Sequence, residues 1–221
     1  MTEPSANLFR EAPRALTKTD LAYGQIREAI LEGHFKPGTT LDQEELAQQL
    51  ELSTTPVREA LRRLESELLV VRRAHRDTVV APLSMTMVEE AFAVRLSLDP
   101  MAASLAAAHA TPEERKQLQE LMFGPEPGPA PVDRVKRHRH LHRAIYAPCH
   151  NTVLVGMLDT LWDIGDRYRL VTLELGAIAP PLQQDHGSVA QAVMDGKVKA
   201  AAKLMHEHTA EAFDKIRDST R

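Results

Sequence analysis

The chain is short of cysteine and of aromatic residues, and it has no long hydrophobic run. Its 221 residues include a single cysteine, Cys149, so an intrachain disulfide is impossible. Aromatic residues make up 4% of the sequence, which predicts a core built mainly from Leu, Ala, Val and Met. No apolar run approaches the roughly 20 residues that cross a bilayer, and residues 1–14 lack the apolar stretch of a signal peptide. We therefore expect a cytoplasmic protein with no membrane partner.

The chain also lacks the excess of positive charge that is typical of proteins that coat nucleic acids. Its formal net charge at pH 7 is -4. The charges are unevenly distributed, however, because the segment from Thr54 to Arg76 contains six arginines and three glutamates. Contact with DNA depends on where charges lie rather than on their sum. The composition therefore argues against a general nucleic-acid coat but allows a local DNA-binding surface.

The first 81 residues show the pattern of a flexible arm followed by a winged helix-turn-helix domain. Residues 1–16 carry little pattern and are expected to form the arm, and residues 17–81 form the domain. Val70–Val71 and Val79–Val80 are predicted strands, and the basic loop between them is the wing. The three helices are predicted to run from Thr19 or Asp20 to Glu32, from Gln43 to Leu50 with Asp42 as cap, and from Ser53 or Thr54 to Leu69.

The third predicted helix has an apolar face and a basic face. At about 100° per residue, its apolar side chains fall together, and Arg58 and Arg62 share the opposite side. Such a helix fits a major groove, with its first residues at the base edges, although a solvated basic face is the plain alternative. The basic wing that follows favours DNA binding. The candidate DNA-binding residues are Thr54, Thr55, Arg58 and Arg62 of the helix and Arg72, Arg73, His75 and Arg76 of the wing.

Residues 85–217 show only helical patterns and predict an all-α helical-bundle domain that binds a ligand. A linker with Pro82 precedes this domain at residues 81–84. Residues 124–131 hold four prolines and two glycines and are predicted to form a loop. Gly196 would separate the last two helices into an antiparallel hairpin. The predicted helices span residues 85–110, 112–123, 133–149, 152–174, 181–195 and 197–217.

Four of the ten histidines lie on the apolar stripes of three predicted helices. His138 and His142 are one turn apart on the same face, a spacing that lets two imidazoles share one metal ion. His186 and His208 lie at nearly equal distances from the turn at Gly196, about 15 and 18 Å along their helices. A single inward histidine is more often a hydrogen-bonded core residue, but four on facing stripes predict a metal site. The histidines off these stripes include His140, His150 and His206.

One arginine, Arg95, lies on the inward stripe of the helix predicted for residues 85–110. Arginine stays charged, and burying it unpaired is costly, so it needs a partner. Asp99, four residues further on, is positioned for an intrahelical ion pair. The alternative is that Arg95 faces the metal cavity and binds an effector carboxylate bidentately. Arg95 is therefore the candidate effector-binding residue, and a small organic acid is the expected effector.

Residues 20–80 resemble the DNA-binding domain of the GntR family of transcription regulators. The sequence departs from that family at Thr54, where Arg is usual, and at Leu68 and Asp77, where Gly is usual. The resemblance implies a winged helix-turn-helix that binds double-stranded DNA. It is carried by Ile30-Leu31-Glu32-Gly33, Phe35-Lys36-Pro37-Gly38, Leu41 with Glu45-Leu46-Ala47, and above all Ser53-Thr54-Thr55-Pro56-Val57-Arg58-Glu59-Ala60-Leu61-Arg62-Arg63-Leu64.

Residues 86–213 resemble the all-helical effector-binding (FCD) domain of the FadR-like branch of the same family. Arg95 matches that domain's early arginine, and Asn151 keeps its spacing after His142. His138 stands where Asp is usual, and the resulting nitrogen-rich set favours Zn²⁺, Ni²⁺ or Cu²⁺ over Mn²⁺ or Mg²⁺. The resemblance implies a divalent ion, with zinc expected and nickel as the second candidate, at His138, His142, His186 and His208.

Together these features predict a DNA-binding transcription regulator, a repressor, that is controlled by an organic-acid effector at a metal-containing site. We expect a homodimer on a palindromic operator, because one recognition helix reads only a half-site. A metal-sensing repressor, in which the ion itself is the signal, is an alternative. A metal-dependent hydrolase is a weaker one, because no motif places a general base or nucleophile beside the histidines and an enzyme would not need the wing.

Overall fold

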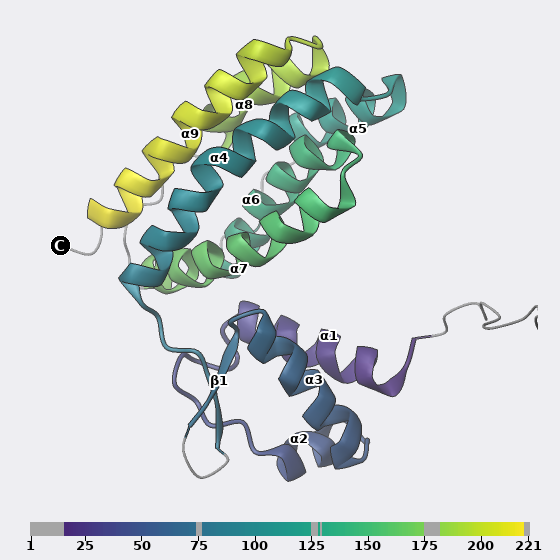
Figure 1. Cartoon of the computed structure of the whole chain (residues 1–221), viewed down its shortest axis with the longest axis vertical. Helices are drawn as coiled ribbons and strands as arrows, with labels where there is room; N and C mark the ends of the chain where they lie inside the picture. Colours follow the sequence, from purple (N-terminus) through teal and green to yellow (C-terminus); the bar gives the residue numbers. More distant parts are fainter. Residues whose placement is uncertain (1–15, 74–76, 125–127, 129, 175–181, 219–221) are drawn as a thin grey trace, which may run out of the picture.

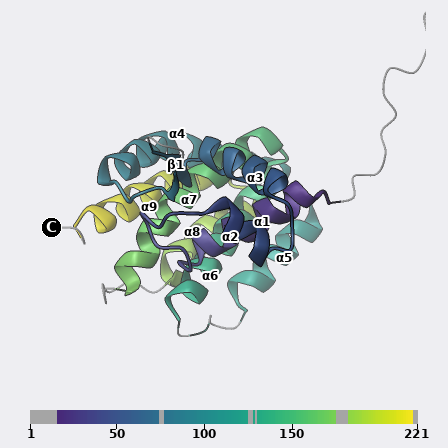
Figure 2. The same ribbon diagram turned by 90° about the horizontal axis from the view of Figure 1, so that it is seen from below.

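The described part of the computed structural model comprises residues 16–73, 77–124, 128, 130–174 and 182–218. In these residues the chain forms a small N-terminal domain below a larger bundle of helices (Figure 1). Viewed from below, the N-terminal domain lies in front of the bundle (Figure 2). The described residues are mainly helical, with one two-stranded sheet, as the sequence predicts. The arm predicted for residues 1–16 lies outside the described residues apart from Leu16.

The N-terminal domain has three helices and a two-stranded antiparallel sheet. α1 begins earlier than predicted, because Thr17 is its N-cap: the Thr17 hydroxyl accepts the Asp20 N–H, and the Asp20 carboxylate accepts the Thr17 N–H. Asp42 caps α2, as predicted. The elements are α1 (Lys18–Leu31), α2 (Gln43–Gln49), α3 (Thr54–Ser66), β1 (Val70–Arg72) and β2 (Thr78–Val80).

The apolar face of α3 forms the core of this domain. Val57, Leu61 and Leu64 are at most 2% exposed and belong to one cluster with Ile26 and Ile30 of α1. Burying a side chain of this size stabilises the fold by about 1.5–3 kcal/mol. This packing fixes the rotation of α3 and leaves its opposite face in solvent.

The C-terminal domain is all-helical in the described residues. The helix predicted for residues 133–149 instead begins at Pro131 and ends at Tyr146, because Pro148 has no N–H and lies in a following 3-10 turn. The elements are α4 (Met85–His109), α5 (Pro112–Met122), α6 (Pro131–Tyr146), the 3-10 turn η1 (Ala147–Cys149), α7 (Thr152–Glu174), α8 (Leu182–Met194) and α9 (Val198–Asp218).

α4 is the core helix of the C-terminal domain. It packs against α7 and α9, and α8 and α9 form the predicted hairpin at Gly196, whose φ is 69°. By length and composition alone α4 is apolar enough to cross a bilayer. However, Arg95 and Asp99 form a buried ion pair within it, and Ala102 and Ala106 are fully buried in the domain core. Its apolar character is therefore used for packing inside the domain.

Candidate metal centre and nucleic-acid interface

The solvent face of α3 carries the helix residues that the sequence predicts to read DNA. Thr54, Thr55, Arg58 and Arg62 are exposed, because the opposite face of the helix is buried in the domain core. Ser53 is the N-cap residue, but its hydroxyl makes no capping hydrogen bond. The first turns of α3 therefore present hydroxyl and guanidinium groups outward, which is the arrangement that a major groove can accept.

A hollow between α3 and the wing gathers polar and basic side chains from four elements. The residues that line this hollow are Gln43, Arg58, Arg72, Arg73 and Thr78. Gln43 was missed by the sequence analysis, because its position at the start of α2 indicated only a helix boundary. His75 and Arg76, the other predicted wing residues, lie outside the described residues.

Two arginines of this region, Arg72 and Arg63, form ion pairs with glutamates of the same domain. Arg72 forms an ion pair with Glu65 at 3.1 Å. Arg63 lies over the ring of Tyr23 and pairs with Glu67 at 3.4 Å, on the side of α3 that faces α1. These ion pairs partly neutralise the positive charge of the arginine-rich segment from Thr54 to Arg76. Among the described arginines of α3 and the wing, Arg58, Arg62 and Arg73 form no ion pair with a described residue.

Four histidines converge in the core of the C-terminal domain. The Nε2 atom of His142 lies 2.6 Å from that of His186 and 3.3 Å from that of His208. Two nitrogen ligands of tetrahedral zinc, with Zn–N bonds of about 2.0–2.1 Å, lie about 3.3 Å apart, so the His142–His208 pair has this spacing and the His142–His186 pair is closer. His138, His142 and His186 are at most 2% exposed. One possible ligand atom from each residue lies within 4.8 Å of the others in the set His138, His142, His186 and His208.

Burial keeps the imidazoles of His138, His142 and His208 neutral. It holds the pKa of His138 and of His142 well below the usual 6.5, and the positive charge of Arg169 lowers the pKa of His138 further. Burial also lowers the pKa of His208 to about 3. Neutral imidazole is the form that binds a metal ion. Nδ1 of His138 is buried without a hydrogen-bond partner among the described residues, which is costly unless the site holds a further ligand.

Arg95 lies beside the cluster and is paired within its own helix. Its Nε and Nη2 donate to Oδ2 of Asp99 at 3.1 and 2.9 Å. Its guanidinium carbon is 3.6 Å from the ring centre of Trp162, and that ring is 3.9 Å from the ring of His142. The intrahelical ion pair considered from the sequence is therefore present, and one tryptophan separates Arg95 from the imidazoles. The role of Arg95 in effector binding stays a prediction.

The remaining polar residues singled out in the sequence lie outside the cluster. His140, His150 and His206 are exposed, in agreement with their positions off the apolar stripes. The side chain of Asn151 accepts the N–H of Leu154 at 3.0 Å, so it caps the start of α7. The residue that matches the family spacing after His142 is thus a capping residue in this fold.

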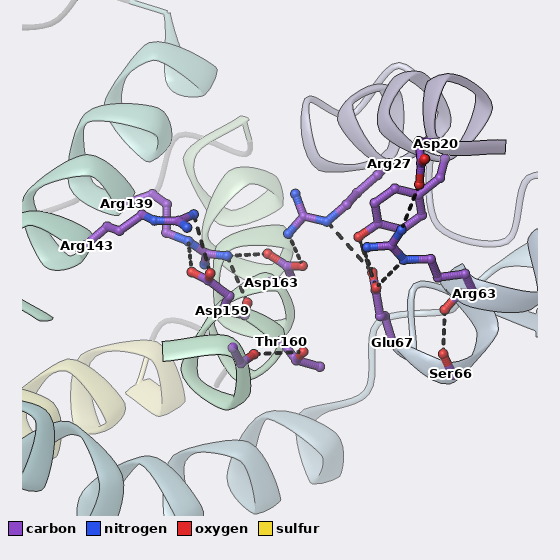
Figure 3. A network of polar contacts seen from close by, with 12 residues as sticks. Asp20, Arg27, Arg63, Ser66, Glu67, Arg139, Arg143, Asp159, Thr160 and Asp163 are labelled. Atoms are coloured by element: carbon purple, nitrogen blue, oxygen red, sulfur yellow. Dashed lines mark hydrogen bonds and ion pairs between the residues drawn. The ribbon is translucent and has the colours of Figure 1, made fainter. Parts of the chain in front are cut away.

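A network of ion pairs joins the two domains (Figure 3). Asp163 of α7, whose side chain is 2% exposed, accepts from Arg27 of α1 at 2.5 Å and from Arg139 of α6. Arg139 also pairs with Asp166 at 2.8 Å. Burial raises the pKa of Asp163, whereas the two arginines lower it. The sequence analysis missed this network, because its members come from three helices and Arg27 is 136 residues from Asp163 along the chain.

Further contacts hold the N-terminal domain against the bundle. Arg167 of α7 donates to the carbonyl of Ala81 in the linker. Gly33, which follows α1 with φ 80°, approaches α7 so closely that a Cβ there would lie 3.1 Å from a methyl group of Leu170. Glycine suits this position both for its φ and for its size. The end of α1 is therefore seated on α7.

A winged helix-turn-helix with an exposed basic face, attached to a helical domain with a buried cluster of histidines, defines a two-domain DNA-binding transcription regulator. The chain belongs to the GntR family of such proteins. Residues 18–80 match the model for "Bacterial regulatory proteins, gntR family", and residues 90–211 match the model for the FCD domain.

Curated relatives resemble the chain along most of its length and are regulators rather than enzymes. The HTH-type transcriptional repressor GlaR of Escherichia coli is 27% identical over 205 residues, which cover 87% of this chain and 93% of the relative. The HTH-type transcriptional regulator YdhC of Bacillus subtilis is 26% identical over 190 residues, which cover 84% and 85%.

Solved structures show the same fold. McbR/YncC of E. coli superposes with a TM-score of 0.79 at 24% identity, covering 94% of this chain and all of that one. A transcriptional regulator GntR of Rhodococcus sp. RHA1 gives a TM-score of 0.71 at 19% identity, covering 92% and 99%. At these identities the likeness supports the arrangement of the elements and not the ligand.

Proposed function

We propose that this regulator is a repressor whose operator affinity is controlled by a small organic acid bound at a divalent metal site in the C-terminal domain. The observation that carries the proposal is the convergence of four imidazoles from α6, α8 and α9 beside Arg95. The name of the relative GlaR, a transcriptional repressor, supports the sign of the regulation. A regulator of this kind acts on DNA in the cytoplasm.

The donor set fits a divalent transition-metal ion. The four candidate ligands are imidazoles, burial holds His138, His142 and His208 neutral, and the buried Nδ1 of His138 has no hydrogen-bond partner among the described residues. An all-nitrogen set favours zinc, with nickel as the second candidate, over magnesium or manganese. His138, His142, His186 and His208 would hold the ion. When bound, the ion supplies a Lewis-acid anchor for an oxygen atom of the effector.

Arg95 supplies the second anchor for an anionic effector. Both of its hydrogen bonds to Asp99 go to the same oxygen, Oδ2, through Nε and Nη2. Its Nη1, which lies near Gly165, makes no hydrogen bond with a described residue and is the donor that remains for an effector. A carboxylate placed there would make a charge-assisted hydrogen bond. A small organic acid, such as a hydroxy or dicarboxylic acid, has oxygens for both anchors.

A homodimer on a palindromic operator follows from the DNA-binding unit, because α3 of one chain reads only a half-site. The neighbouring helices α4 and α7 offer a surface for the second copy. Apolar side chains of these two helices are 47–67% exposed, and they are Val94, Met101, Val153 and Met157. Exposed apolar side chains that gather on adjacent helices are typical of interfaces.

The ion-pair network offers a route from the ligand to the DNA. Arg139 follows the candidate ligand His138 on α6, and Asp163 follows Trp162 on α7. A ligand that draws these helices together would therefore move the partners of Arg27 and shift α1 with the N-terminal domain. The shift in operator affinity is limited by the difference between the effector's affinities for the two arrangements.

A metal-sensing repressor is the second candidate function. The observation that favours it is the pairing of Arg95 with Asp99, which already neutralises the charge that an organic acid would use. Both candidates use the same four histidines. They differ in whether the ion alone changes operator affinity.

Operator binding measured in three states separates the candidates. An operator fragment selected from random DNA is titrated with metal-free protein, with zinc-loaded protein, and with zinc-loaded protein plus a panel of organic acids. The proposal expects release of DNA only when an acid and zinc are both present, and loss of this release in Arg95→Ala. Release by zinc alone would identify a metal sensor. Release by an acid that is undiminished in Arg95→Ala would contradict the role of Arg95.

A further inference from the structure

Tyr146, the last residue of α6, lies one helical turn after His142 and is 3% exposed. Its hydroxyl oxygen is 2.9 Å from Nδ1 of His142. This nitrogen is on the opposite side of the imidazole ring from Nε2, the atom that faces His186 and His208. Tyr146 therefore contacts the one ring nitrogen of His142 that points away from the cluster.

The two nitrogens of His142 have complementary requirements. An imidazole that offers the Nε2 lone pair to an ion must carry its proton on Nδ1, and this proton needs a hydrogen-bond acceptor. The Tyr146 hydroxyl is at hydrogen-bond distance from Nδ1, and both side chains are buried. Accepting the Nδ1 proton leaves the Tyr146 hydroxyl proton available for a different acceptor.

The hydroxyl proton of Tyr146 has an acceptor on α9. The Tyr146 hydroxyl donates to Sδ of Met205 at 3.7 Å, which is a weak acceptor. The oxygen of this hydroxyl is therefore left to accept the Nδ1 proton of His142.

We propose that Tyr146 is a positioning residue that fixes His142 as an Nε2 ligand of the metal ion. This inference rests on the proposed function, because it assumes that the histidines bind an ion. The Tyr146 hydroxyl accepts the Nδ1 proton of His142, and this tautomer leaves the Nε2 lone pair free for the ion.

The zinc affinity of the Tyr146→Phe variant tests this positioning role, because the substitution removes only the hydroxyl that contacts Nδ1 of His142. Zinc is titrated into metal-free protein against a competing chelator. Loss of such a hydrogen bond to a metal-ligating histidine lowers metal affinity about 10–100-fold. Tyr168→Phe, on half-buried Tyr168 of α7, is the matched control and should bind zinc like the unaltered protein. Equal zinc affinities for Tyr146→Phe and Tyr168→Phe would overturn the inference.

Nitrogen NMR of the histidine side chains identifies which ring nitrogen of His142 carries the proton. This protonation would not change if Tyr146 only packed in the core. In the zinc-loaded unaltered protein, His142 should carry a slowly exchanging proton on Nδ1, and this signal should be lost or exchange rapidly in Tyr146→Phe. His142 bound to zinc through Nδ1 would refute the proposal even if the variant failed to fold. No zinc binding by the unaltered protein would instead refute the metal site itself, so the two failures are distinguishable.

Discussion

The DNA-facing surface of α3 and the histidine cluster of the C-terminal domain use basic side chains in opposite ways. On α3, Arg58 and Arg62 are exposed and form no ion pair with a described residue, so their charges remain available. In the cluster, burial lowers the pKa of His138 and His142 and removes their charge. A polyanion is attracted by exposed cations, whereas a metal cation is bound by neutral lone pairs. Solvent exposure therefore decides which partner each set of nitrogens suits.

The largest expected effect concerns His142, because its substitution should prevent the histidine cluster from binding a metal ion. His142→Ala should lose the metal ion that we expect in each chain, because the Nε2 atom of His142 lies nearest to those of His186 and His208. A site that is saturated at 1,000 times its Kd stabilises a fold by about 4.1 kcal/mol, so chelation should lower the melting temperature. Metal analysis of protein purified without a metal-affinity column measures the content.

Exposed His140, two residues before His142 on α6, provides the control for this prediction. His140→Ala should keep the metal and the melting temperature of the unaltered protein. Equal metal contents in the two variants would show that the cluster is a set of core residues and would remove the contrast with α3.

The next effect separates buried from exposed charge on a single helix. Arg139→Ala would leave the buried carboxylates of Asp163 and Asp166 without this partner, and breaking a buried pair in this way costs about 3–5 kcal/mol. Arg143, one turn further on, has a side chain that is 59% exposed and pairs with Asp159 at 3.3 Å. Arg143→Ala should cost at most about 1 kcal/mol. Urea unfolding followed by circular dichroism gives both changes in the free energy of unfolding. Equal losses of stability in the two variants would contradict the importance of the buried ion pair between Arg139 and Asp163.

A smaller effect is expected at the DNA surface. Arg58→Ala should weaken binding to a selected operator by about 1–3 kcal/mol if Arg58 contacts a base, and it should leave stability unchanged because the side chain is exposed. Arg73→Ala, in the wing, should weaken binding to all sequences alike and reduce the salt dependence, as expected for a phosphate contact. Titrations of specific and unrelated DNA at two salt concentrations distinguish the two. Unchanged operator affinity in Arg58→Ala would show that its exposure has no role in recognition.

Much of the fold could be predicted from local pattern. The period of apolar residues gave the helices, and it placed His138, His142, His186 and His208 on inward stripes that the structure brings together. Helix ends were less predictable. Thr17, rather than Thr19 or Asp20, is the N-cap of α1. Its side chain and backbone form the two reciprocal hydrogen bonds of a capping box with Asp20, three positions further on.

Contacts between distant segments could not be predicted in the same way. Arg27 and Asp163 are 136 residues apart, and nothing in either local sequence indicates their ion pair. Tyr146 was similarly overlooked, because an aromatic residue at the end of a helix has the pattern of a core residue. Its contact with Nδ1 of His142 depends on the rotation of that imidazole, which periodicity does not determine.

The smallest effect concerns Leu68, which follows α3 with φ 62° and stands where the GntR family usually has glycine. A left-handed conformation costs a residue with a Cβ about 1–2 kcal/mol, and glycine avoids this cost but loses about 0.5–1 kcal/mol more conformational entropy on folding. The Leu68 side chain is 43% exposed, so little packing is lost on its removal. Leu68→Gly should therefore raise the free energy of unfolding by about 0.5 kcal/mol. Leu68→Ala keeps the backbone strain and should not raise the free energy of unfolding, so it is the control. Urea unfolding compares the two variants. Equal free energies of unfolding for Leu68→Gly and Leu68→Ala would show that the strain at this helix end is negligible.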